Sequence, residues 1–212
     1  MTLDSLNASY GKKTVLAGFT LDIPDGSITA VLGKSGCGKT TLLNAIASNP
    51  SRRVSYVFQE PRLIPWKTLE RNITLALEGP REERKRIAGE YLAKVGLAGR
   101  EGDYPERISG GERQRVSIAR AFARQSELLL MDEPFQAQDA LQKRQLIGVF
   151  LSLHERERRT VIAVTHDIAE ALSIADHIVV LSGPPVTTVF SGPARGIDGA
   201  PVTESALMKA LS

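Results

Sequence analysis

A glycine-rich stretch over residues 33–40 has residue types that suit the chemistry of phosphate groups. It reads GKSGCGKT and satisfies the pattern G-x-x-x-x-G-K-[ST]. Glycines let consecutive backbone N–H groups turn toward phosphate oxygens, and the N-terminus of a following helix adds the positive end of its dipole. Lys39 is expected to reach the β- and γ-phosphates of a nucleotide, and the Thr40 hydroxyl is expected to ligate Mg²⁺. The pattern predicts a nucleotide site with magnesium.

The residues predicted to contact this nucleotide cover the whole stretch. A thiol has no chemical task in such a loop, so we interpret the cysteine as a small loop residue. The predicted phosphate-contacting set is Gly33, Lys34, Ser35, Gly36, Cys37, Gly38, Lys39, Thr40 and Thr41.

An acidic pair after an apolar run supplies the second half of the same chemistry. Residues 128–131 are apolar and are followed directly by Asp132, Glu133 and Pro134. Asp132 is predicted to hold Mg²⁺ from the end of a strand. Glu133 follows where a carboxylate can polarise a water for attack on the γ-phosphate. Alone, such a triplet is equally compatible with a strand-ending turn. Together with the glycine-rich stretch, it indicates nucleotide hydrolysis.

These residues need strands and helices to position them, and the sequence alternates between the two. Helical spacing, with apolar residues three or four apart, occurs for example at Ile87, Tyr91 and Val95. Strands that alternate with helices favour an α/β fold around a mostly parallel sheet. The glycine-rich stretch lies between an expected strand over residues 28–32 and an expected helix over 41–48. Buried strands are predicted over residues 27–32, 54–58, 128–131, 160–164 and 177–181.

Three parts of the chain depart from this alternation. The first 26 residues contain apolar segments broken by turn signals at residues 17–18 and 24–26, and they predict an antiparallel strand pair. Residues 67–124 show no convincing strand and predict an inserted helical subdomain. Residues 183–212 are rich in Gly, Pro, Ser and Thr and predict an irregular tail with one short helix over 204–211. We expect one domain over residues 1–212.

The composition excludes several classes of protein. The chain has 212 residues, of which 42% are hydrophobic and 24% charged, as in soluble globular domains. Its apolar runs are far shorter than the roughly 18 residues that span a bilayer, and its start lacks the pattern of a secretory signal. A formal net charge of +3 is poor support for nucleic-acid binding. One cysteine fits a reducing cytosol.

A third motif, residues 108–115, points to a family. It reads ISGGERQR, lies shortly before the acidic pair, and is similar to the signature sequence of the nucleotide-binding subunits of ABC transporters. On these motifs the chain resembles that family from Tyr10 to about Leu181. The resemblance implies a P-loop NTPase of RecA-like fold that binds ATP and Mg²⁺ and hydrolyses ATP for transport. Ile108 and Glu112 replace the commoner leucine and glutamine, which are mild departures.

The resemblance implies roles for further residues by position. Tyr10 would stack on adenine, with an ordinary strand tyrosine as the alternative. Gln59 would sense Mg²⁺ and the attacking water, and His166 would contact the γ-phosphate. Asp139 would contact the opposite subunit of a dimer. The implied catalytic residues are Gln59, Glu133 and His166, and the implied metal ligands are Thr40, Gln59 and Asp132.

The resemblance also implies a dimer of two copies of this chain. Each ATP would be held by the glycine-rich loop of one copy and by Ser109, Gly110 and Gly111 of the other, because these residues begin a helix whose N-terminus suits a γ-phosphate. Residues 136–139 read QAQD where SALD is usual, which leaves a hydroxyl contact across the dimer in doubt. The interval from Lys39 to Gln59 is shorter than the family norm, and a β-hairpin within it is expected to be missing.

The transporter class follows from a further stretch. Residues 58–66, FQEPRLIPW, resemble importer ATPases of the nitrate, sulfonate, taurine and thiamine-precursor group. This implies permease subunits in the membrane, a separate solute-binding protein, and a cytoplasmic location on the inner face of the membrane. Trp66 is expected either at the permease-facing surface or in the core. The alternative function is a soluble ABC ATPase without a transport role, and the signature argues against a P-loop kinase or GTPase.

Overall fold

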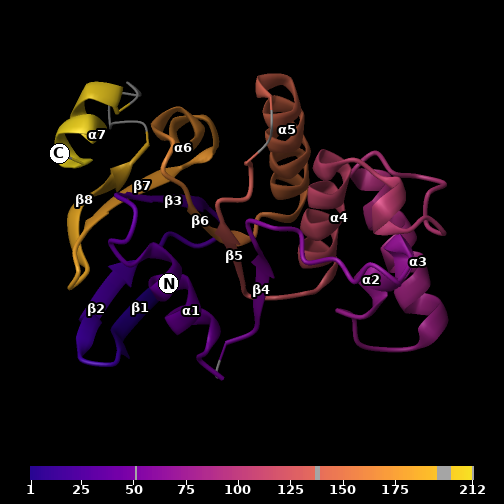
Figure 1. Ribbon diagram of the computed structural model, residues 1–212, viewed down its shortest axis with the longest axis horizontal. Coiled ribbons are helices and arrows are strands. Elements are labelled where there is room, and N and C mark those ends of the chain that lie inside the picture. The colour runs from indigo at the N-terminus through magenta and orange to yellow at the C-terminus, as the bar shows by residue number, and fades with distance from the viewer. Residues whose placement is uncertain (51, 137–138, 195–201, 212) are drawn as a thin grey trace.

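The computed structural model describes residues 1–50, 52–136, 139–194 and 202–211. Its centre is a six-stranded sheet of order β4-β5-β6-β3-β7-β8, parallel throughout except for the last pair, and β1 and β2 form a separate antiparallel sheet (Figure 1). This confirms the expected α/β fold. The strands are β1 (Thr2–Tyr10), β2 (Lys13–Asp22), β3 (Ile28–Gly33), β4 (Val54–Val57), β5 (Leu128–Asp132), β6 (Thr160–Val164), β7 (His177–Ser182) and β8 (Thr187–Pro193).

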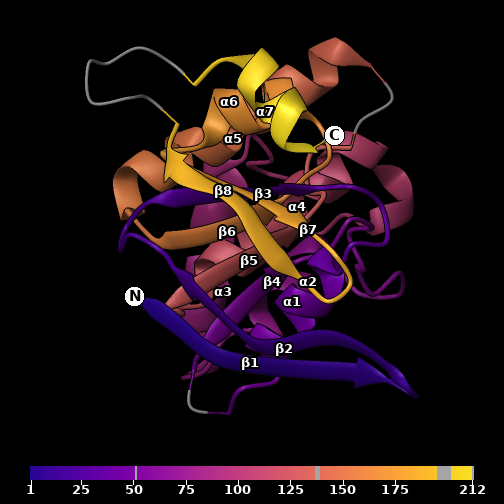
Figure 2. The ribbon, with the colours of Figure 1, turned by 90° about the vertical axis from the view of Figure 1, so that its left-hand side faces the viewer.

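Helices cover the sheet on both sides. Figure 2 shows α6 and α7 beyond one side of the six-stranded sheet, and α1 and the β1–β2 pair beyond the other. The helices are α1 (Lys39–Ala47), α2 (Leu69–Thr74), α3 (Arg81–Lys94), α4 (Gly110–Ala123), α5 (Ala140–Glu157), α6 (Ile168–Ile174) and α7 (Glu204–Leu211), and η1 (Pro105–Arg107) is a single 3₁₀ turn.

The central strands are apolar on both faces because both faces are covered. All six residues of β3 are buried, and so are all five of β6. Such continuous apolar runs are typical of parallel strands between helical layers. The five predicted buried strands lie within one residue of the observed bounds. Helix α1 begins at Lys39, two residues earlier than predicted.

The strand order brings the predicted motifs to one edge of the sheet. β6 lies between β3 and β5, with Val164 paired to Val31 on one side and to Asp132 on the other. The carboxyl ends of these three parallel strands therefore meet. Ligands of open parallel sheets bind at this edge.

The N-terminal strand pair differs from the expectation in one respect. A break was expected at residues 17–18, but β2 continues through them. Gly18 adopts a left-handed φ of +61° at the point where the pairing shifts between Leu6↔Phe19 and Ala8↔Leu16. The extra residue is accommodated as a bulge, which glycine tolerates because it has no Cβ. The turn signal marks an irregularity within a strand rather than its end.

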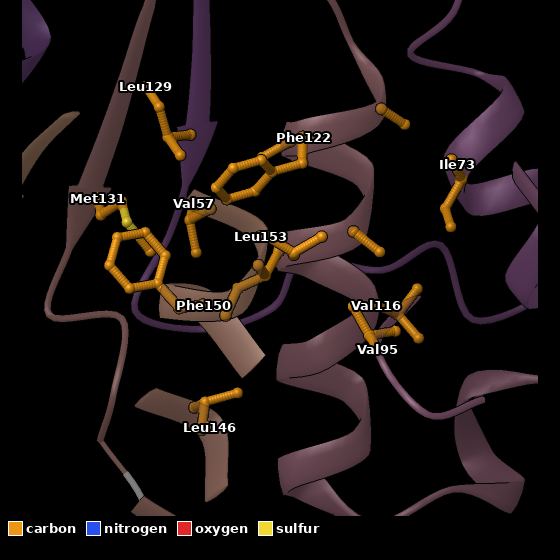
Figure 3. Packing of buried hydrophobic residues seen from close by; sticks show 14 of the residues in the cluster. Val57, Ile73, Val95, Val116, Phe122, Leu129, Met131, Leu146, Phe150 and Leu153 are labelled. Atoms are coloured by element: carbon orange, nitrogen blue, oxygen red, sulfur yellow. The ribbon is translucent and has the colours of Figure 1, made fainter. Parts of the chain in front are cut away.

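The helices α2, α3 and α4 form the expected helical insertion, at the end of the molecule away from β8 (Figure 1). Helix α4 packs on the sheet and joins the insertion to it. In Figure 3, Phe122 of α4 and Phe150 of α5 lie over Leu129 and Met131 of β5, with their ring centroids 6.1 Å apart. The insertion and the sheet thus share one apolar core.

The C-terminal tail is more regular than expected. Residues 183–212 were expected to be irregular, but Thr187–Pro193 form β8, which pairs antiparallel with β7. Backbone pairing to an existing strand edge needs no apolar alternation, so the composition of this segment did not reveal it. Helix α7 has the predicted bounds, and its Leu207 is buried.

The described residues lack a hairpin after α1 and a membrane-spanning helix. Between α1 and β4 the described residues form no strand, in keeping with the expected loss of a hairpin there. Within the described ranges, no helix has the length and apolarity to span a bilayer.

Phe150 is the centre of the shared core, since its ring also lies 5.4 Å from that of Phe135. We expect Phe150→Ala to lower the free energy of unfolding by about 3–5 kcal/mol, because it leaves a cavity between sheet and helices. Urea denaturation measures this. Leu141→Ala on the exposed side of the same helix is the control, with an expected change within about 0.5 kcal/mol. Equal effects would contradict the assigned core.

Candidate functional site

A cleft of about 610 Å³ lies at the carboxyl edge of β3, β5 and β6, and we call it the phosphate cleft. It brings together residues predicted from separate motifs. Those in its wall are Tyr10, Ser35, Gly36, Gly38, Lys39, Thr40, Thr41, Gln59, Asp132, Glu133 and His166. Lys13, Val15 and Gln136 also line it and were not predicted as site residues.

The glycine-rich loop is built as a cradle that larger residues would fill. Gly36 and Gly38 adopt left-handed φ values of +77° and +118°. A Cβ at Gly38 would come within 2.8 Å of Val15 and 2.5 Å of Val186. Gly38 has no side chain to cap α1, so the first N–H groups of that helix are open to an anion. This geometry fits a bound polyphosphate.

Lys39 is folded back on its own loop. Its Nζ donates to the carbonyls of Gly33 at 2.7 Å and Lys34 at 3.1 Å, and the residue is buried. The loop carbonyls thus hold the ammonium at the floor of the phosphate cleft. A polyphosphate bound in the loop would lie close to this positive charge and be attracted to it.

Three predicted phosphate contacts lie outside the cleft wall. They are Gly33, Lys34 and Cys37. Cys37 is buried in the core, and a Cβ at Gly33 would lie 2.7 Å from its Sγ. These residues shape the loop from behind, which agrees with the interpretation of the cysteine as a small loop residue.

Two of the three predicted magnesium ligands, Thr40 and Asp132, meet at the start of α1. The Thr40 hydroxyl donates to Asp132 Oδ2 at 3.1 Å. Burial raises the pKa of the Asp132 carboxyl above its ordinary value, and the hydrogen bond from Thr40 opposes this shift. A hydroxyl, a carboxylate and phosphate oxygens are the oxygen ligands that Mg²⁺ prefers. Within the described residues, no group of three or more His, Cys, Asp or Glu could hold a metal ion.

Glu133 is held in an unusual backbone conformation. Its φ is +44°, a left-handed value that costs a non-glycine residue free energy, and its N–H donates to the Val164 carbonyl at 2.9 Å. Nδ1 of His166 lies 3.0 Å from Glu133 Oε2. The end of β6 therefore fixes the backbone of Glu133, and the residue that follows β6 by two positions contacts its carboxylate.

Gln136 joins this group and was missed as a site residue. Its Nε2 donates to Glu133 Oε2, and its Oε1 accepts from Gln59 Nε2 at 2.8 Å. From the sequence it was only a departure from a family pattern. The available signal was a long amide side chain three residues after the predicted base. Ala137 and Gln138, which belong to the same departure, lie outside the described residues.

The signature residues do not reach the phosphate cleft of their own chain. Ser109, Gly110 and Gly111 line a separate cleft of about 370 Å³, which we call the signature cleft. Gln59 and Gln136 line both clefts. The two halves of the predicted nucleotide site are therefore apart within one chain, and the two glutamines lie between them.

The signature begins α4 with a complete capping box. The Ser109 hydroxyl accepts from the Glu112 N–H at 3.2 Å, and the Glu112 carboxylate accepts from the Ser109 N–H at 2.8 Å and pairs with Arg100 at 2.7 Å. The backbone N–H of Ser109 and then the Arg100 charge hold the pKa of the Glu112 carboxyl below its ordinary value, against an opposing contribution from desolvation. The departure to glutamate at this position thus stabilises the helix start.

Helix α4 is also anchored through Gln114, whose Nε2 donates to the carbonyls of Phe58 at 3.2 Å and Pro134 at 2.8 Å. Asp139 caps α5 by accepting from Gln142 N–H at 2.7 Å.

Near His166, Lys143 of α5 forms ion pairs with Asp167 and Glu170 at the start of α6. Side chains of three helices thus position the loops around Glu133.

Two aromatic residues face outward. Tyr10 is 61% exposed at the end of β1 and lines the phosphate cleft, where a flat ring is open to a base. Trp66 is 73% exposed, which excludes the core position considered from the sequence.

Comparisons with known proteins point to one family. The family described as ABC transporter matches residues 16–136 of the chain. The chain is 46% identical over 191 residues to an aliphatic sulfonates import ATP-binding protein of Streptomyces avermitilis, covering 84% of this chain and 75% of that protein. It is 43% identical over 199 residues to a protein of the same description from Paraburkholderia xenovorans, covering 90% of this chain and 80% of that one.

A solved structure agrees with these relatives. It is a dimeric ATP-binding cassette in a post-hydrolysis state, bound to ADP and Pi. The match has a TM-score of 0.75 at 27% identity and covers 93% of this chain and 100% of that one.

The capping box makes the stability of α4 depend on pH. Because the pKa of Glu112 is lowered by folding, its contribution is present above the unfolded value of about 4.3 and is lost as pH falls through the folded value. We expect Glu112→Gln to lower the free energy of unfolding at pH 7 by up to about 1 kcal/mol, and the difference to shrink below about pH 4. Urea denaturation at both pH values measures it. Glu106→Gln, at an exposed position nearby, is the control. A difference independent of pH would contradict the charge-based explanation.

Proposed function

The chain belongs to the ABC transporter family as an ATP-binding subunit that hydrolyses ATP with Mg²⁺, and on that premise we propose that it powers the import of an organic sulfonate or a related small anion. We also propose that residues 1–212 form one cassette domain. We base the assignment of the site on one observation, which is that four residues from separate motifs line the same cleft: Lys39, Thr40, Asp132 and Glu133. The sulfonate class rests on the relatives that are 43% and 46% identical.

The residues of the phosphate cleft divide the reaction among them. The glycine-rich loop and Lys39 bind the β- and γ-phosphates, and Tyr10 stacks on the adenine ring. Thr40, Asp132 and Gln59 hold Mg²⁺, which when bound neutralises phosphate charge. Glu133 accepts a proton from the water that attacks the γ-phosphorus, as the bond from that phosphorus to the ADP oxygen breaks. His166 contacts the γ-phosphate and keeps the Glu133 carboxylate in place.

A second copy of the chain completes each site. Ser109, Gly110 and Gly111 lie in the signature cleft, apart from the phosphate cleft of the same chain. We propose that the N-terminus of α4 in one copy closes over the γ-phosphate held by the other. ATP then becomes part of the interface, and loss of the γ-phosphate weakens it.

The membrane partner is proposed to contact the helical insertion. The loop before α2 is held by buried Asn72, whose side chain bonds the backbone of Ile64 and Lys67, and this presents Trp66 to solvent. Leu75 is also exposed on this insertion. Trp66 lies on the segment that follows Gln59 in the chain, and these exposed apolar side chains suit contact with a permease subunit at the cytoplasmic face of the membrane. A solute-binding protein would deliver the cargo to that permease.

Two variants test the nucleotide chemistry. Lys39→Ala is expected to lose most ATP affinity in calorimetry, because the loop loses the charge that faces the phosphates. Glu133→Gln is expected to keep binding, to lose at least roughly a hundredfold in turnover, and to accumulate dimers with ATP in sedimentation. Wild-type hydrolysis by Glu133→Gln would remove Glu133 as the base, and unchanged binding by Lys39→Ala would remove the phosphate role of the lysine.

Import is tested in a deletion strain grown on an alkanesulfonate as the only sulfur source. The wild-type gene is expected to restore growth, and Trp66→Ser to restore little, because the permease contact is weakened. Val189→Ser changes another exposed apolar residue, on β8 at the far end of the molecule, and is the control that restores growth. Both variants should keep the wild-type melting temperature. No growth with the wild-type gene would exclude sulfonates, and full growth with Trp66→Ser would exclude the docking role.

A further inference from the structure

Four side chains around the predicted base form one continuous hydrogen-bonded series. Gln59 donates to Gln136 at 2.8 Å, Gln136 donates to Glu133 Oε2, and His166 lies 3.0 Å from the same oxygen. The series begins after β4, passes through the segment after β5 and ends after β6. It therefore joins three loops that approach the γ-phosphate position from different strands.

The hydrogen-bonding groups of Gln59 and Glu133 limit which side chain can occupy position 136 between them. Gln59 presents an N–H to Gln136, so the middle group must accept a hydrogen bond there. Glu133 presents a carboxylate oxygen, so the same group must also donate. An amide does both at once. A carboxylate can only accept, and a thioether such as methionine cannot donate.

The two contacts to Glu133 fall on one oxygen. Oε2 is engaged by Gln136 and His166, and neither contact involves Oε1. Two contacts on one oxygen restrict the orientation of the carboxylate and leave Oε1 outside both. Because a water must meet that oxygen in a narrow range of positions, the restricted orientation favours proton abstraction.

The backbones at both ends of the Gln59–Gln136 contact are tied together as well. Gln114, buried in α4, bonds the carbonyl of Phe58 and the carbonyl of Pro134 through one amide nitrogen. Phe58 precedes Gln59, and Pro134 follows Glu133. Both backbone segments are thus connected to α4, and Gln136 lines both the phosphate cleft and the signature cleft.

We propose that Gln136 is a positioning residue that makes the orientation of the Glu133 carboxylate depend on the position of Gln59. When the Gln59 loop moves, the Gln136 carbonyl oxygen loses the hydrogen bond that it accepts from Gln59. The Gln136 side chain is then less well ordered, and its hydrogen bond to the Glu133 carboxylate weakens. The rate of hydrolysis then follows the state of a loop beside the proposed permease surface. This inference rests on the proposed role of Glu133 as the base.

The test uses the purified full chain and steady-state ATP hydrolysis. Gln136→Met keeps the length of the side chain and removes both hydrogen bonds, and we expect kcat to fall roughly tenfold or more while KM for ATP stays within about twofold. Gln136→Glu accepts from Gln59 but cannot donate to Glu133, and it is expected to lose as much. Gln125→Met makes the same chemical change at an exposed glutamine that lines neither cleft, and is the matched control.

A double-mutant cycle separates positioning from a merely structural role. In a Gln59→Leu background, Gln136→Met is expected to cost less than about threefold, because Gln136 without its contact to Gln59 already holds the Glu133 carboxylate weakly. Independent, multiplicative losses would overturn the proposal, and so would wild-type kcat in both Gln136 variants. Slow hydrolysis by Glu133→Gln alongside normal Gln136 variants would reject this inference alone, whereas rapid hydrolysis by Glu133→Gln would reject the proposed base itself.

Discussion

Everything at this site depends on three parallel strands ending at one edge of a buried sheet. β6 lies between β3 and β5, and its Val164 pairs with both neighbours. All residues of β3 and β6 are buried, so their side chains pack against covering layers on both faces of the sheet, and a slip of one residue in either strand would disrupt this packing. The apolar core therefore fixes the register, and the register brings the Thr40 hydroxyl, on the helix that follows β3, to Asp132 at the end of β5, although β3 and β5 are not adjacent.

Helix α4 transmits this order to the helical insertion because it is held at both ends. At the C-terminal end of α4, the carbonyls of Phe122 and Arg124 accept hydrogen bonds from Arg159, which lies just before β6. A cation at this end also interacts favourably with the helix dipole. Gln114 bonds the carbonyls of Phe58 and Pro134 at the other end. The signature residues thus keep a set place relative to the phosphate cleft, although they do not line it.

One non-glycine residue with a left-handed backbone lies where the chemistry is proposed to occur. The left-handed backbone of Glu133 persists because the Val164 carbonyl accepts its N–H and buried Phe135 anchors the following turn. The carboxylate is then contacted by Gln136 of the same segment and by His166 from the segment after β6. A site assembled in this way is sensitive to small loop movements, which suits a motor whose rate must respond to a partner.

The sequence alone determined the motifs, the buried strands and the family, since these depend on local patterns of glycine, acid and apolar residues. It placed the glycine-rich loop after the correct strand and predicted α7 to the residue. Tertiary structure alone decided the bulge at Gly18, the pairing of β8, the exposure of Trp66 and the bridge made by Gln136. Each of these depends on contacts between segments far apart in the chain, whose geometry follows from packing and strand pairing rather than from any local pattern.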